Sequence, residues 1–220
     1  MAADGEGAQM MIWLGALALY LLFRLWYDNW RGPMKPAEVE AFMTALTARA
    51  ATDHESANNA ELRDTIRSFL DNDDGREFVM LNLVKIAREA ADPVTGAMTD
   101  GRVLLQRYSK PFIKALFARG GHPAYVARPA GGYVDAWGPG VPADPGWSIV
   151  GLMRYRSRRD MAALVLDPRF AAIHPYKIAS TPLTFSFPTS PMLRLFVGPR
   201  LWVGLAIALG AALMQLTFSH

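Results

Sequence analysis

The chain begins and ends with a long apolar run, and the stretch between the two runs is mixed in character. Residues Met10–Tyr27 contain a single charge, at Arg24, and residues Leu201–Phe218 contain none. A helix of this length spans about 27 Å, close to the hydrocarbon thickness of a bilayer. We therefore expect transmembrane helices over residues 10–30 and 195–218, with a short tail over residues 1–9.

A cleavable signal peptide is the alternative reading of the first run. It would need a basic segment ahead of the apolar one, but residues 1–9 contain no Lys or Arg and carry Asp4 and Glu6. All 23 Lys and Arg residues lie between Arg24 and Arg200 inclusive. Because cytoplasmic flanks carry an excess of these residues, we expect an integral protein of the bacterial inner membrane. Both termini are then extracytoplasmic and the central domain is cytoplasmic.

Between the two runs the spacing of hydrophobic residues changes from helical to strand-like. Residues 31–75 are expected to form a linker with two amphipathic helices, and residues 76–190 a domain. The continuous apolar run Phe78–Ile86 is typical of a strand that is covered on both faces. Before that strand we expect helices over 36–51 and 59–70, and after it a helix over 103–119 that is kinked or divided at Pro111. A bent strand or hairpin over 124–128 and 133–137 and a strand over 147–155 should follow. The last elements are a helix from the capping box Ser157–Asp160, a short helical turn after Asp167 and a strand over 183–187.

This order of elements, β-α-β-β-α-β, predicts an α+β fold: a ferredoxin-like split βαβ domain flanked by two transmembrane helices. One four-stranded sheet with helices on one face leaves its other face bare, and a second copy of the chain is the usual cover. Along the first strand, Phe78, Met80, Asn82 and Val84 share one face. We expect the face with Phe78, Met80 and Val84 to line the interior of a homodimer.

Several short motifs resemble an uncharacterised family of the dimeric α/β-barrel superfamily, over about residues 73–188. They are Asp73–Arg76 followed by Phe78–Val84, then Arg107-Tyr108, Gly120-Gly121, Arg154–Ser157 and Asp167–Phe170. The resemblance implies two ferredoxin-like units that close their sheets into one barrel around a cavity. Relatives in the superfamily include haem-degrading and polyketide-modifying monooxygenases. The two terminal anchors and Pro111 depart from the soluble pattern of the superfamily.

Composition excludes several classes of chemistry. Cysteine is absent, so disulfides, thiolate catalysis and cysteine-ligated metals are excluded. The net charge of +3 and the lack of a long basic run argue against nucleic acid as a partner. No phosphate-binding loop, nucleophile elbow or carboxylate-rich metal motif appears, and we predict no metal site.

Six residues are weak candidates for ligand binding or catalysis. Asn82 is the polar member of an apolar strand, where it either binds a ligand or satisfies backbone groups. The resemblance implies the first role, because haem-degrading relatives use an asparagine that looks equivalent. His122 and His174 are general-base or haem-ligand candidates if they are not simply structural. Tyr108 is a ligand candidate or a core residue, and Trp137, with Asp135, lies at a cavity mouth or in a hairpin.

Four arginines gather around the start of the predicted helix at Ser157, namely Arg154, Arg156, Arg158 and Arg159. They oppose the helix dipole, so the helix gains nothing from them. They are candidates to bind an anionic ligand or membrane lipid, against the alternative of a solvated basic face. In the second apolar run, Gly204, Ala208 and Ala212 share one face, which either packs on another helix or is small filler.

Two functions follow, and they belong to different classes. In the first, the protein is a non-catalytic accessory or assembly subunit whose anchors dock a larger membrane complex. In the alternative, the barrel cavity binds a small apolar or aromatic molecule and oxygenates it without a cofactor. No motif requires a cofactor, and haem or a quinone stays open as a ligand.

Overall fold

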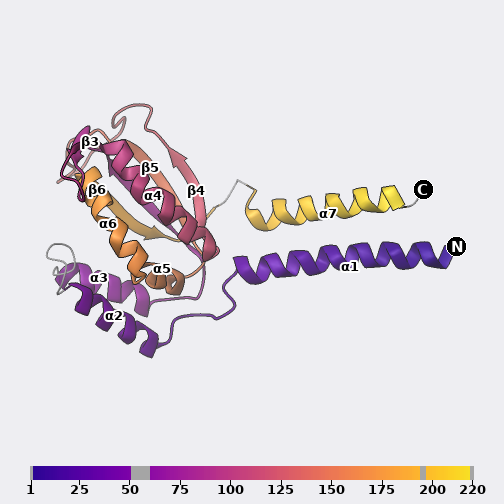
Figure 1. The fold of residues 1–220 in the computed structure, drawn as a ribbon. Coiled ribbons are helices and arrows are strands. Elements are labelled where there is room, and N and C mark those ends of the chain that lie inside the picture. The colour runs from indigo at the N-terminus through magenta and orange to yellow at the C-terminus, as the bar shows by residue number, and fades with distance from the viewer. Residues whose placement is uncertain (1, 51–59, 194–196, 219–220) are drawn as a thin grey trace. The chain divides into compact units, whose positions relative to one another are not determined.

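The computed structural model describes residues 2–50, 60–193 and 197–218 of the chain. These residues fall into two compact units (Figure 1). One unit combines the two ends of the chain, residues 1–30 and 191–220. The other consists of residues 31–190.

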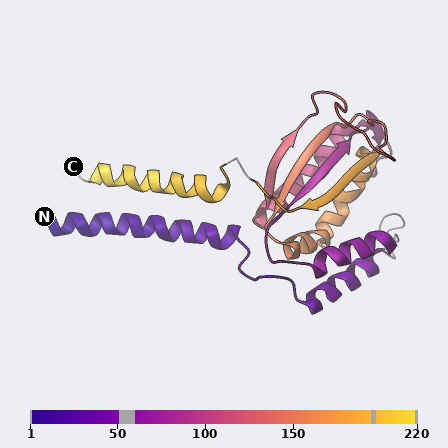
Figure 2. The ribbon, with the colours of Figure 1, turned by 180° about the vertical axis from the view of Figure 1, so that it is seen from behind.

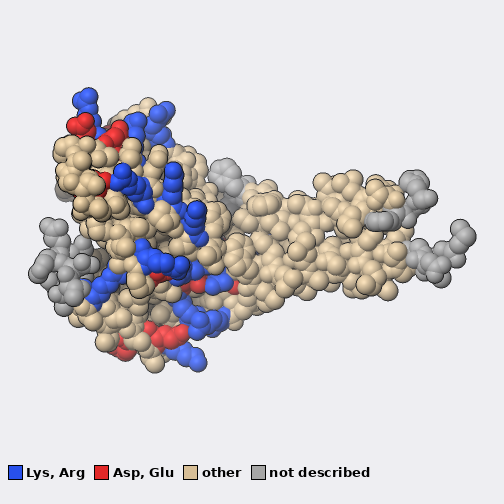
Figure 3. Space-filling model, in the orientation of Figure 1, with Lys and Arg blue, Asp and Glu red and all other residues tan. Residues whose placement is uncertain are grey.

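The terminal unit contains two long helices, α1 (Ala2–Tyr27) and α7 (Pro199–Phe218). Both are long and apolar enough to span a membrane, over Glu6–Tyr27 and Pro199–Thr217. Almost none of these residues is buried, whereas the core helix of a soluble protein would be mostly buried. Helix α1 begins at Ala2, so most of the segment predicted as a short tail is helical. In the view of Figure 3 the two helices show an almost uncharged surface, while Lys and Arg gather on the other unit.

The second unit is built on a four-stranded sheet in which every neighbouring pair is antiparallel. The strands, in the order in which they lie side by side, are β4 (His122–Ala127), β5 (Ile149–Tyr155), β1 (Phe78–Lys85) and β6 (Leu183–Thr189). The α+β class is confirmed, and β1, β5 and β6 lie within about two residues of their predicted bounds.

Three helices cover one face of this sheet, and none of the helices described in this unit lies in front of the other face (Figures 1 and 2). They are α4 (Gly101–Ala118), α5 (Arg158–Val165) and α6 (Pro168–Ser180). Phe78 of β1 stacks on Tyr155 of β5 at 5.1 Å between ring centroids, and both pack against Leu116 of α4. This aromatic layer is the main core, and its apolar burial is the dominant stabilising contribution.

A second, smaller core joins the remaining two helices to the rest of the unit. Helix α2 (Pro36–Ala50) and helix α3 (Ala60–Asp71) pack against α5. The cluster centres on Phe42, Leu70 and Ala162, which are almost fully buried. Residues 31–75 are therefore packed onto the domain and do not form a loose linker.

Four local predictions are corrected by the structure. Residues 133–137 form no strand, because the Pro129 and Gly131-Gly132 segment leads into a loop. A hairpin of β2 (Glu89–Ala91) and β3 (Met98–Asp100) was missed, although Asp92 and Gly96, whose φ is +72°, mark its turn. Pro111 does not divide α4, which is continuous around it. Beyond Asp167, α6 is a full helix of 13 residues.

Helix starts behave as the sequence predicts. Ser157 caps α5, its Oγ accepting from the backbone N–H of Asp160 at 3.1 Å, while its hydroxyl donates to the Asp160 carboxylate at 2.6 Å. The first contact satisfies a helix-end N–H that would otherwise lack a partner. The predicted start of a helix at Ser157 is confirmed.

Candidate functional site

The candidate site is the sheet face that no helix covers. Two rows of apolar side chains cross all four strands on this face, because residues directly opposite each other in an antiparallel ladder point the same way. One row runs Tyr125–Leu152–Leu81–Phe187, and the other runs Ala127–Val150–Leu83–Phe185. Tyr125, Phe185 and Phe187 are each about half exposed, at 50%, 51% and 50%. A contiguous exposed apolar patch of this kind marks an interaction site.

The prediction about the interior face of a dimer is wrong for Phe78 and Met80. Both pack against the helices in the main core, so the side chains of the open face are instead those of Leu81 and Leu83. Both faces of β1 are apolar in sequence, and for that reason the pattern alone did not distinguish them.

The loop between β4 and β5 closes one end of the open face. Trp147 donates from its indole Nε1 to the hydroxyl of Tyr133 at 2.8 Å, and its ring lies 5.5 Å from that of Phe185. The Asp144 carboxylate accepts from the backbone N–H of Tyr133 at 3.1 Å and of Gly146 at 2.8 Å. These contacts form a hollow of about 480 Å³ floored by Leu83 and Val150. The sequence singled out Trp137 for this region, but its side chain lies almost fully in solvent.

Asn82 lies on the opposite, helix-covered side of the sheet. Its amide Nδ2 donates to the carbonyl oxygens of Met80 at 3.0 Å and Gly151 at 3.3 Å, and its Oδ1 accepts from the Ser186 hydroxyl at 2.8 Å. Gly151, directly across the ladder, leaves room for this side chain. The contacts are those expected of a residue that satisfies backbone groups.

Tyr108 and His174 come together between α4 and α6, while His122 lies elsewhere. The Tyr108 ring stacks on Phe112 at 5.5 Å and meets the His174 ring at 6.4 Å. Burial raises the pKa of the Tyr108 hydroxyl well above its ordinary value. His122 opens β4, with its Nδ1 2.9 Å from the carbonyl oxygen of Pro123. The three residues therefore form no common site.

Lys177 was missed by the sequence reading, and it lies beside Tyr108. Its Nζ is 5.8 Å from the centroid of the Tyr108 ring, a cation–π geometry. Burial lowers the pKa of the Lys177 amine. The position of Lys177 on the inner side of α6 is the signal that could have revealed it. That position was not recognised, because only a short helical turn was expected after Asp167.

The four arginines near α5 do not converge on one point, and each has a carboxylate partner from this chain. The N···O distances are 2.5 Å for Arg154–Glu77, 2.6 Å for Arg156–Asp160, 3.5 Å for Arg158–Asp73 and 2.9 Å for Arg159–Glu38. Their charges are thereby balanced within the protein. Three of the four partners lie 77 to 121 residues away in the sequence.

Arg159 fixes the segment that leads into α2. Its guanidinium donates to the carbonyl oxygens of Gly32 at 3.2 Å and Pro33 at 2.9 Å, besides its pairing with Glu38. The hydrogen bond from Arg159 is the main reason that the pKa of Glu38 is lowered, to about 2. Gly75, with φ +72°, lies so close to Pro33 that a Cβ would meet its nitrogen at 2.8 Å. Only glycine fits there.

In the terminal unit, α1 and α7 pack against each other. Gly204 faces the Tyr20 ring, where a Cβ would lie 3.2 Å from Cε2. The Tyr20 hydroxyl is 3.1 Å from the carbonyl oxygen of Arg200, and the Trp13 indole donates to Gln215 at 2.9 Å. Gly204, the first residue of the predicted row of small residues, thus meets a helix of this same chain.

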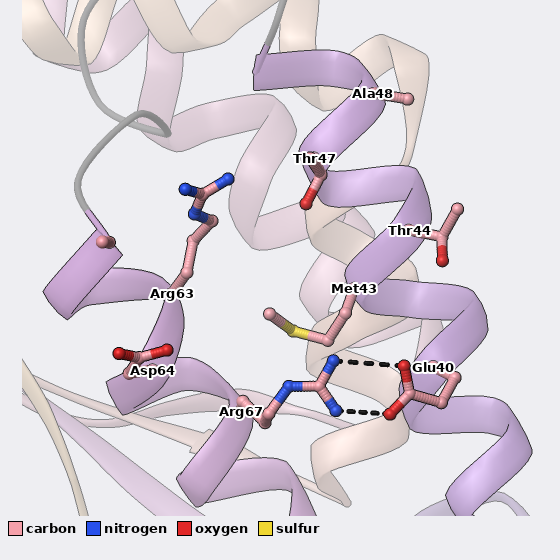
Figure 4. A pocket seen from close by; sticks show the side chains of 9 residues that line it. Glu40, Met43, Thr44, Thr47, Ala48, Arg63, Asp64 and Arg67 are labelled. Carbon is pink, nitrogen blue, oxygen red and sulfur yellow. Dashed lines mark hydrogen bonds and ion pairs between the residues drawn. The ribbon is translucent and has the colours of Figure 1, made fainter.

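A second hollow, a groove of about 600 Å³, lies between α2 and α3 (Figure 4). Arg67 of α3 and Glu40 of α2 are paired across it, with Nη2 and Oε2 3.1 Å apart. Its lining reaches Ala48 and Ala60, on either side of residues 51–59, which lie outside the described part of the chain. We assign it no ligand. Among the described residues there is no group of three side chains suited to hold a metal ion.

These observations define an α+β protein with two helices able to span a membrane and one open apolar sheet face. No family model matches the sequence, and no curated protein is significantly similar to it. Two solved structures of a protein of unknown function from Rhodopseudomonas palustris, one of its methylated form, are similar in fold, each with a TM-score of 0.51. They are 20% and 21% identical and cover 62% and 63% of this chain and 95% of the other. At that identity, the likeness concerns the fold alone.

Proposed function

We propose that this protein is a membrane-anchored, non-catalytic accessory or assembly subunit that works as a homodimer of the dimeric α/β-barrel type. The single observation behind the proposal is the open sheet face with its two apolar rows. The strand order β4-β5-β1-β6, with helices on one side, supports a ferredoxin-like domain. The sequence resemblance adds support for the barrel.

The size of the exposed patch supports the proposal of a partner. Each half-exposed aromatic side chain leaves about 100 Å² in water, which corresponds to roughly 2.5 kcal/mol when buried. Tyr125, Phe185 and Phe187 from two copies would together contribute about 15 kcal/mol before the cost of association. The centre of the face is aliphatic and aromatic, so it is complementary to itself across a twofold axis.

The accessory role is favoured over the oxygenase role by where the polar candidates lie. The Asn82 amide is bonded to backbone carbonyls, the arginines to carboxylates, and the two histidines lie apart. The alternative, a binder or oxygenase of a small apolar molecule, would use the cavity that the paired sheets enclose. Small-molecule content of the purified protein therefore separates the two.

The dimer is tested with a charge placed on the open face. Phe187→Asp in the full chain, purified in mild detergent, should turn a dimer into a monomer by light scattering at tens of micromolar protein. Phe117→Asp is the matched control, because Phe117 is 46% exposed but lies on α4, away from the open face. A wild type that is monomeric, or a Phe187→Asp variant that stays dimeric, contradicts the proposal.

The accessory role is tested by mass spectrometry of what co-purifies from native membranes. We expect membrane proteins to be recovered in constant ratio with the wild type and with Phe117→Asp, and a wild type that brings down no protein partner contradicts the accessory role. Recovery of a stoichiometric small apolar molecule, without protein partners, would instead support the binder.

A further inference from the structure

One end of the terminal unit carries a compact charged cluster, at the point where α1 ends and α7 begins. Arg24 Nε donates to one carboxylate oxygen of Asp28, and Arg200 Nε donates to the other at 2.7 Å. The Arg200 guanidinium also lies over the Tyr27 ring, with 5.0 Å from Cζ to the centroid. Two guanidinium groups from two different helices thus share one carboxylate.

The cluster has more positive charge than its own carboxylate can balance. Two arginines and one aspartate leave a net charge of +1. The Arg24 and Arg200 side chains are 33% and 36% exposed, whereas Asp28 is 12% exposed. The positive groups therefore form the outer surface of the cluster.

Exposed tryptophans lie close in sequence to the two arginines and indicate the depth of the cluster in a bilayer. Trp26, Trp30 and Trp202 are 42%, 63% and 53% exposed. The Trp30 indole donates to the carbonyl oxygen of Arg24 at 3.0 Å, which ties this ring to the cluster. Tryptophan side chains gather at the headgroup level of membranes. Two arginines at that level lie where lipid phosphates are found.

We propose that Arg24 and Arg200 together bind the phosphodiester of an anionic phospholipid. Arginine presents a planar fork of donors that matches phosphate oxygens. The net charge of +1 favours an anionic headgroup over a zwitterionic one. The site lies wholly in the terminal unit, so it does not depend on the function proposed for the sheet.

Native mass spectrometry of the full chain in mild detergent tests this site. The probes are phosphatidylglycerol and phosphatidylcholine with identical acyl chains, added at matched concentrations. We expect the first phosphatidylglycerol to bind at least fivefold more tightly than phosphatidylcholine. Arg200→Gln should weaken phosphatidylglycerol binding by about fivefold, the usual effect of one arginine near an anionic surface.

Two further variants separate lipid binding from a purely structural lock between the helices. Asp28→Asn raises the net charge of the cluster to +2, so it should strengthen phosphatidylglycerol binding, although it weakens the contact between α1 and α7. Arg169→Gln is the matched control, since Arg169 is an exposed arginine of the other unit. A loss of binding in both Arg200→Gln and Asp28→Asn, or equal affinity for the two lipids, overturns the proposal. Displacement of the lipid by millimolar inorganic phosphate would assign the site to free phosphate and overturn it too.

Discussion

Glu77→Gln should destabilise the second unit strongly, because it leaves the Arg154 guanidinium buried without a counter-charge. The Arg154 side chain is 3% exposed, and two of its nitrogens lie 3.0 and 2.5 Å from one oxygen of Glu77. Its remaining Nη donates to the carbonyl oxygen of Gly120. Removing one partner of a buried ion pair costs about 3–5 kcal/mol. Gln keeps the shape of Glu and one acceptor, so we expect about 3 kcal/mol.

Amide hydrogen exchange of peptides from β1 and β5 is the appropriate assay, because it reports the free energy of opening of this unit in the intact chain. Arg154→Met in the Glu77→Gln background should cost less than the sum of the two single changes, since it removes the stranded charge. Glu40→Gln, in the exposed pair with Arg67, is the control and should change little. A cost below about 1 kcal/mol for Glu77→Gln would refute the reasoning, because it would mean that Arg154 is solvated.

Three other outcomes follow from the structure. Asn82→Ala should lower the stability of the second unit by about 1–3 kcal/mol, because the carbonyl oxygens of Met80 and Gly151 lose their donor; a normal stability with a lost response to haem or a quinone would show a ligand site instead. The pKa of Glu38 is lower in the folded protein than its ordinary value of 4.5, so its contribution to stability is complete above pH 4.5 and is lost as the pH falls toward about 2. In an acid titration, the stabilities of wild type and Glu38→Gln should therefore converge between these two pH values. Reporter fusions at Met1 and His220 should both report an extracytoplasmic location, and a cytoplasmic signal from either would contradict the charge argument.

The two helices long and apolar enough to span a membrane could be predicted from the sequence, because each is a local property of one run. Residues 10–27 and 201–218 are apolar whatever they contact, so their length and composition sufficed. The capping box at Ser157 is local in the same way. Such features need no knowledge of the distant parts of the chain.

The parts of the site that the sequence did not reveal depend on contacts between distant residues. The sequence suggests a basic cluster that includes Arg154 and Arg159, because their carboxylate partners, Glu77 and Glu38, lie 77 and 121 residues away. The faces of β1 could not be assigned, since Leu81 and Leu83 are as apolar as Phe78 and Met80. Only the packing of α4 against Phe78 decides which face stays open.

The order in which the sheet is completed has a consequence for biosynthesis. Strand β1 is central, yet its neighbour β6 is the last strand made, and Val79 pairs with Thr189 across 110 residues. Until β6 emerges from the ribosome, β1 presents an unpaired edge, which is a template for wrong pairing. Helix α7 begins ten residues after Thr189. The sheet can therefore be completed only shortly before the second long apolar helix is synthesised.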